Sequence, residues 1–79
     1  MAKYRLHIER VGFVGPTYRF RDDAQGYAEA HYFGGANTEL EKVSPSDAGE
    51  LPCWLVVDPA ADELRADDVT IVLIEGDES

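Results

Sequence analysis

The chain has 79 residues, enough for one domain with a small core, since a chain of this length buries only about 60% of its unfolded surface. Its single cysteine, Cys53, excludes an internal disulfide and favours a reducing, cytoplasmic setting. A net charge of −9 opposes direct binding to nucleic acid or anionic membranes and favours a basic partner.

The charge is unevenly distributed along the chain. Residues 1–21 carry five of the seven bases and one acid, a net charge of +4, whereas residues 22–79 carry two bases and fifteen acids, a net charge of −13. The N-terminal residues alternate in polarity and lack the apolar core of a signal peptide, and no apolar run is long enough to span a bilayer. We therefore expect a chain that enters no membrane and has a basic start and an acidic remainder.

Residues 2–21 are predicted to form an antiparallel hairpin. Residues 2–11 alternate, with Tyr4, Leu6 and Ile8 on one face and charged side chains on the other, which is typical of a half-buried strand. Glycines and a proline in residues 12–16 predict the connecting loop, with Phe13 and Val14 at its tip, and residues 17–21 alternate again. The apolar pair at the tip either anchors a partner or folds over the open end of the core.

A helix is predicted over residues 22–33. Asp22 is the expected N-cap, Gln25 is expected to reach back to it, and the acids favour the positive end of the helix dipole. Apolar positions recur at helical spacing, and Gly34 and Gly35 predict the stop. The alternative is a strand over residues 27–33 paired with 17–21, because these residues also alternate and Gly26 disfavours a helix.

Three further strands are predicted, over residues 38–43, 53–57 and 69–75. Residues 44–52 are expected to form a loop, Asp58 and Pro59 to begin a short helical turn, and residues 76–79 to form an acidic tail. The result is a single compact α+β domain over residues 1–79, in the order ββαβββ. We expect a mostly antiparallel sheet with the one helix packed on one of its faces.

The strands at 53–57 and 69–74 are apolar on both faces. Such strands are normally covered on both sides, yet the sequence predicts one helix, which covers one face. The second face, with Thr70, Val72 and Ile74, is either an exposed interface or is covered by residues 58–68 or by curling of the sheet.

No catalytic, cofactor or metal motif stands out. Cys53 lies in an apolar strand, where a thiol stays protonated, and it is interpreted as a core residue and not as a nucleophile paired with His7 or His31. The two histidines have no zinc-ligand spacing, and the acids of residues 58–68 lack the pattern of a calcium loop. The sequence therefore predicts no enzyme and no cofactor.

The basic hairpin has two interpretations. Lys3, Arg5, Arg19 and Arg21 project from one face and can contact phosphates. Alternatively, if the third strand pairs beside the first, Glu39 and Glu41 neutralise Lys3 and Arg5 across the sheet. We favour neutralisation, because the charge of the whole chain opposes nucleic acid at a distance.

The predicted function is that of a non-enzymatic, acidic protein-binding module. A concrete form is an inhibitor whose carboxylates occupy the basic nucleic-acid channel of another protein. Small size, strong acidity and lack of catalytic chemistry are shared with phage-encoded anti-defence proteins, including many anti-CRISPR proteins, which act in the host cytoplasm; this is a likeness of class and of no particular family. The alternative is a structural or accessory subunit that assembles through the apolar sheet face, as a homodimer or with another protein.

Two sets of contact residues follow from these hypotheses. The acidic set comprises Asp22, Asp23, Glu29, Glu39, Glu41, Asp58, Asp62, Glu63, Asp67 and Asp68. The apolar set comprises Phe13, Val14, Thr70, Val72 and Ile74.

Overall fold

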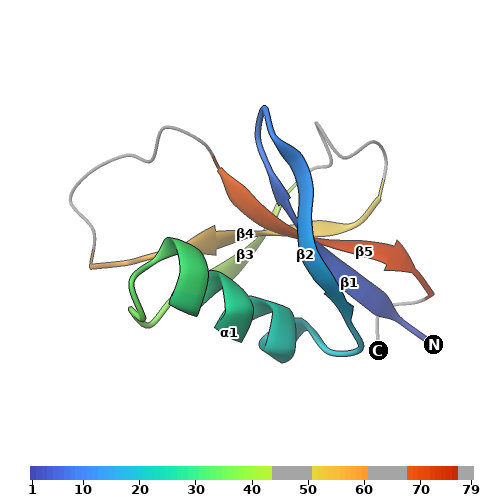
Figure 1. Ribbon diagram of the computed structural model, residues 1–79, viewed down its shortest axis with the longest axis horizontal. Coiled ribbons are helices and arrows are strands. Elements are labelled where there is room, and N and C mark those ends of the chain that lie inside the picture. Colours follow the sequence, from blue (N-terminus) through green and yellow to red (C-terminus); the bar gives the residue numbers. More distant parts are fainter. Residues whose placement is uncertain (44–50, 61–67, 77–79) are drawn as a thin grey trace.

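The alternating and apolar segments of the chain form one five-stranded antiparallel sheet with a helix on one face (Figure 1), which confirms the predicted α+β fold. The computed structural model describes residues 1–43, 51–60 and 68–76. The elements are β1 (Lys3–Ile8), β2 (Gly12–Tyr18), α1 (Arg21–Tyr32), β3 (Glu39–Val43), β4 (Cys53–Val57) and β5 (Val69–Glu75). Within the described residues, no helix is long and apolar enough to cross a membrane.

The apolar strand β5 lies at the centre of the sheet. The strand order is β2-β1-β5-β4-β3, and all neighbours are antiparallel. Val72 of β5 therefore has Arg5 of β1 on one side and Cys53 of β4 on the other. The central position of β5 agrees with its apolar composition, because a central strand has a neighbouring strand on each edge and is covered most completely.

The core lies between the sheet and α1. Leu6, Val69 and Ile71 are fully buried on the face that the helix covers. The helix contributes Ala24 and Ala28, both fully buried, and these small side chains let it approach the sheet closely.

The helix over residues 22–33 is confirmed, and the alternative strand is wrong. Its predicted start is also wrong in detail: the N-cap is Phe20, no side chain caps the helix, and α1 begins at Arg21. The amide of Gln25 instead donates to the carbonyl and the hydroxyl of Thr38, both at 2.9 Å. A tertiary partner outside the helix thus replaces the local capping contact, which sequence spacing does not reveal.

The hairpin is confirmed, but its loop is not where the glycines indicated. The chain turns over residues 9–11, where Arg10 has a φ of 70° and the amide of Val11 donates to the carbonyl of Ile8. Residues 12–18 are strand, with an irregularity in the pairing opposite residues 4–6. Gly15 lies at this irregularity and has a φ of 71°, a backbone conformation that favours glycine. A Cβ at this position would approach the Tyr27 ring to 3.0 Å.

The third strand does not pair beside the first. β3 lies at the far edge of the sheet and pairs with β4, so Glu39 and Glu41 lie opposite Val57 and Leu55. Neutralisation of Lys3 and Arg5 by these two carboxylates across adjacent strands is therefore wrong, because two strands separate β3 from β1.

Candidate binding surfaces

The outer face of the sheet, opposite α1, is covered at its centre. Val72 is fully buried, Cys53 is 3% exposed and His7 is 8% exposed, whereas Thr70 and Ile74 are half-buried. The hydroxyl of Thr70 donates to the carbonyl of His7 at 3.1 Å. Of the three side chains predicted for an apolar interface on this face, Thr70 and Ile74 are thus the ones that reach the surface.

The pair Phe13-Val14 lies within β2, and its two side chains point to opposite faces. Val14 packs against the core, opposite Leu6. Phe13 is 40% exposed on the outer face, where its ring meets the His7 ring edge-on at 5.1 Å between centroids. The Arg5 guanidinium lies 5.9 Å from the Phe13 ring centre and donates to the carbonyl of Gly15 at 2.8 Å. Only Phe13 of this pair therefore contributes appreciable apolar surface.

The predicted acidic residues fall into three groups. Exposed carboxylates lie on the first turn of α1, on β3 and just before β5; these are Asp22, Asp23, Glu39, Glu41 and Asp68. Two others serve the fold; these are Glu29, which accepts from the amide and hydroxyl of Thr38 at 2.7 Å each, and Asp58, which accepts from the amide of Ala60 at 3.0 Å. Three lie outside the described residues; these are Asp62, Glu63 and Asp67.

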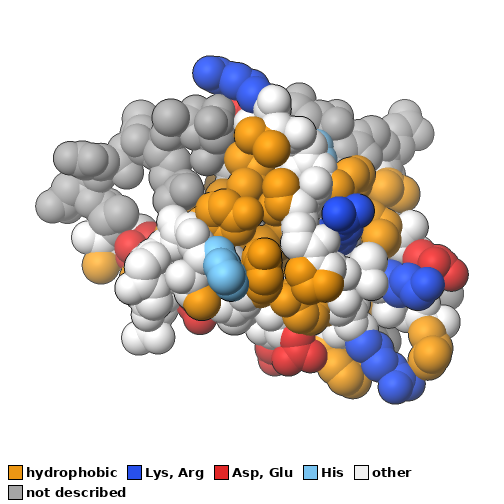
Figure 2. All heavy atoms as spheres, viewed as in Figure 1, with side chains coloured by type: hydrophobic (Ala, Val, Ile, Leu, Met, Phe, Trp, Pro, Cys, Tyr) orange, Lys and Arg blue, Asp and Glu red, His pale blue; other side chains and the backbone are white. Residues whose placement is uncertain are grey.

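The basic side chains contact groups other than the carboxylates of β3. Lys3 forms an exposed ion pair with Glu75 at 3.3 Å. Arg21 lies 4.5 Å from the centre of the Trp54 ring, and Lys42 lies 5.6 Å from the same ring. On the face in Figure 2, blue Lys and Arg side chains gather at the lower right, where β1 begins and β2 ends in Figure 1. The cations are thus held mainly by aromatic rings.

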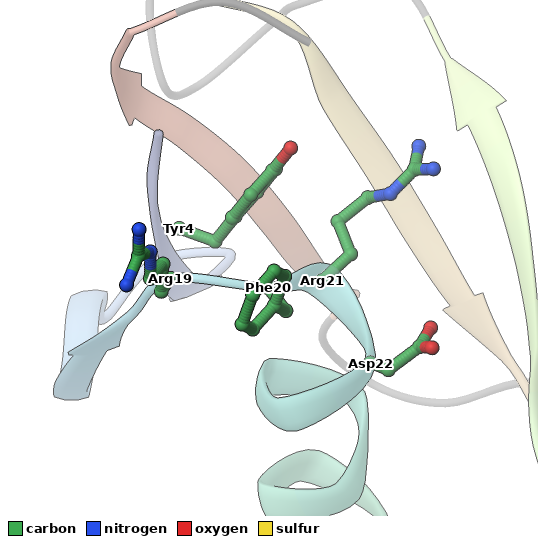
Figure 3. Close-up of a pocket in the computed structure, with 5 residues that line it drawn as sticks. All are labelled: Tyr4, Arg19, Phe20, Arg21 and Asp22. Carbon is green, nitrogen blue, oxygen red and sulfur yellow. The ribbon is translucent and has the colours of Figure 1, made fainter. Parts of the chain in front are cut away.

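A hollow that sequence reasoning did not identify lies where β1 meets the link between β2 and α1. It is lined by Tyr4, Arg19, Phe20, Arg21 and Asp22, as Figure 3 shows. The sequence signal was the triplet 19–21, an aromatic residue between two arginines at a strand–helix boundary. The alternation of residues 17–21 predicts that Tyr18 and Phe20 point inward, yet Phe20 is 61% exposed, because β2 ends at Tyr18 and the alternation ends with it.

The described residues favour neither a reactive cysteine nor a metal site. Burial raises the pKa of the Cys53 thiol above its ordinary value of 9.0, which disfavours the reactive thiolate, and its Sγ lies 3.8 Å from the carbonyl oxygen of Val43. Across the described ranges, no group of three or more His, Cys, Asp or Glu side chains is arranged to hold a metal ion.

Comparison of this chain with protein families, curated proteins and solved structures finds no match.

Proposed function

We propose that the protein is a non-enzymatic binding module whose exposed carboxylates dock on a basic surface of a partner protein. The observation that carries the proposal is on β3, an edge strand, where Glu39 and Glu41 are both exposed. Within the part of the chain that the structure describes, neither carboxylate is in an ion pair. Their charge is therefore available to a partner.

The described basic residues Lys3, Arg5 and Arg21 do not cancel this charge, because they contact other groups. Arg5 and Arg21 contact a backbone carbonyl and aromatic rings, and Lys3 pairs with Glu75 and not with the acids of β3. The net charge of −9 thus acts outward and accelerates encounter with a cationic surface. A nucleic-acid-binding channel is one such surface, since carboxylates can take the positions of phosphates against the same lysines and arginines.

We do not propose the alternative, assembly through the apolar outer face of the sheet. Val72, the residue at the centre of that face, is fully buried within a single chain. The strip that remains is made of half-buried side chains, Leu55, Val57, Thr70 and Ile74. Burying such side chains on association would remove little additional apolar surface from water.

The proposal is tested by measuring binding to basic nucleases and nucleic-acid-binding effector complexes at about 50 and 200 mM salt, where screening of exposed charges differs strongly. A protein acting through its carboxylates should lose affinity at the higher salt concentration. The double variant Glu39→Gln/Glu41→Gln should weaken binding more than Asp22→Asn/Asp23→Asn, which removes the same charge from α1. Affinity that is indifferent to salt and to both double variants would refute the proposal.

A further inference from the structure

We propose that the hollow between Tyr4 and the start of α1 binds the phosphate of a nucleotide, with the base of that nucleotide stacked on Phe20. This site is separate from the carboxylates of β3, and it binds an anion instead of a basic partner. Its lining carries two bases, Arg19 and Arg21, and one acid, Asp22, so the local charge favours an anion although the whole chain is acidic.

The first support is the hydroxyl of Tyr4. The Tyr4 side chain is 4% exposed, its ring packs against Trp54 at 5.9 Å between centroids, and it lines the hollow. The described structure gives this hydroxyl no hydrogen-bond partner. A buried polar group without a partner is uncommon and costly, because it loses its hydrogen bonds to water and gains none in return. A ligand oxygen in the hollow would supply the missing acceptor.

The second support is Arg21. Its guanidinium lies over the Trp54 ring at 4.5 Å, and Figure 3 shows Tyr4 and Arg21 extending toward the same side of the link that precedes α1. Stacking uses the face of a guanidinium and leaves the N–H groups at its edge able to donate. Two such donors match two oxygens of a phosphate, a geometry that lysine cannot provide. Arg19 adds a second positive charge beside the hollow.

The size of the hollow and the position of Phe20 define the ligand. The volume is about 190 Å³, smaller than the roughly 300–1,000 Å³ of sites that enclose a whole drug-sized ligand. A phosphate group fits in such an open hollow, whereas a nucleoside must extend beyond it. Phe20 borders the hollow and is 61% exposed, and although the Arg19 guanidinium lies 5.9 Å from its ring centre, the exposed ring surface is large enough for a base to stack on it.

Asp22 also lines the hollow and sets a limit on affinity. Figure 3 shows its carboxylate on the opposite side of Phe20 from Arg19 and below the Arg21 guanidinium. A negative charge near a bound phosphate weakens binding, since like charges repel at short range. The variant Asp22→Asn should therefore bind phosphate more tightly than the wild-type protein, which is the reverse of its expected effect on a basic partner.

The experiment titrates inorganic phosphate, adenosine monophosphate and a short single-stranded oligonucleotide into the full chain. Trp54 is the sole tryptophan and touches both Tyr4 and Arg21, so its fluorescence reports occupancy of the hollow. Binding of the free mononucleotide identifies a nucleotide ligand, and binding of the oligonucleotide alone identifies a single strand as the source of the same phosphate. No saturable binding of any of the three at low salt would overturn the proposal.

Variants separate the site from general electrostatics. Tyr4→Phe removes one oxygen that the fold does not use, so the melting temperature should stay unchanged while phosphate affinity falls about tenfold or more, as for a hydrogen bond to a charged group. Tyr18→Phe is the matched control, because Tyr18 pairs with Tyr4 across β1 and β2 but does not line the hollow. Equal affinities of these two variants would overturn the assignment of Tyr4.

A second pair of variants tests the base platform and the charge. Phe20→Ala should reduce affinity for the mononucleotide about fivefold or more and leave that for inorganic phosphate unchanged, because only the nucleotide stacks. Arg21→Gln should weaken both ligands, whereas Arg10→Gln, with the same change in charge, should weaken neither appreciably. Arg10 lies in the turn after β1, about 20 Å of extended chain from Tyr4. Equal losses of affinity in the two arginine variants would mean that binding depends on net charge alone, and would refute the site.

Discussion

The two sides of the sheet use charge in opposite ways. On β1, Arg5 lies against the Phe13 ring and Lys3 pairs with Glu75, and at the start of α1 Arg21 lies against the Trp54 ring of β4. On the other side, the edge strand β3 presents Glu39 and Glu41 to solvent without an ion pair in the described structure. The arginines thus contribute to packing as well as to charge, and the carboxylates of β3 contribute charge alone.

The difference follows from the chemistry of the two side-chain types. A guanidinium is weakly hydrated and planar, so it stacks on Trp or Phe with little cost of desolvation. A carboxylate needs donors, and β3 is far from the bases of β1. A chain polarised in sequence therefore remains polarised in space, with the carboxylates of β3 exposed and the guanidinium groups of Arg5 and Arg21 partly buried.

The largest expected effect comes from the strand that holds the two sides in one sheet. Val72→Lys places a charge at a fully buried position between β1 and β4, and it should lower the free energy of unfolding by about 3 kcal/mol or more. Ile74→Lys, two residues along on the same face and half-buried, should cost below about 1 kcal/mol, because its ammonium can reach water. Urea denaturation followed by circular dichroism measures both, and equal costs would mean that the outer face is open along its length.

A smaller effect tests whether the arginines contribute to packing. Arg21→Ala removes a half-buried stem and a guanidinium stacked on Trp54, and it should cost about 1–2 kcal/mol of stability. The variant Glu39→Gln/Glu41→Gln on the opposite edge should change stability by at most about 0.5 kcal/mol, since the replaced groups are exposed. Urea unfolding monitored by Trp54 fluorescence compares them. A larger loss on β3 than at Arg21 would reverse the comparison.

Local patterns in the sequence were sufficient to predict the elements and the fold class. Alternation predicted β1, a mostly β-branched apolar run predicted the central strand β5, and helical spacing of apolar positions with two following glycines predicted α1. These signals succeed because burial on one face requires the same period in the sequence as in the structure. The prediction of a loop over residues 12–16 was wrong, because glycine occurs both in loops and at irregular positions within strands. Here Gly15 allows an irregular strand to pass close to Tyr27.

Strand order and the hollow were beyond the reach of local patterns. The position of β3 at the far edge depends on which strands pair across long stretches of chain, and no period encodes it. The hollow combines Tyr4 of β1 with residues 19–22, and the burial of Tyr4 without a hydrogen-bond partner is visible only in three dimensions. The covered centre of the outer face was likewise undecided by composition, because a valine at position 72 fits a core and an interface equally well.

Alkaline pH tests which side of the sheet opens first. Burial raises the pKa of Cys53 on β4 above 9.0, and burial together with Tyr27 and Asp23 raises the pKa of Tyr18 on β2 above 10.0. The unfolded chain therefore loses each proton first, so each group's contribution to stability is complete below the ordinary pKa and is lost as pH rises through the folded-state value. Hydrogen exchange should show β3 and β4 losing protection at lower pH than β2, and Cys53→Ala should abolish that early loss. Simultaneous loss on both sides would show that the sheet opens as one unit.

The smallest expected effect concerns the ion pair on the basic side. Lys3 and Glu75 lie directly opposite each other on β1 and β5, but their side chains are 53% and 64% exposed, so solvent screens their attraction. A double-mutant cycle with Lys3→Gln and Glu75→Gln should give a coupling free energy of about 0.3 kcal/mol, decreasing further with added salt. A coupling above about 1 kcal/mol that persists in salt would mean that this side is held by ion pairing. The basic side would then differ from β3 because its charges have an opposite charge beside them. Stacking of cations on aromatic rings would be the smaller contribution.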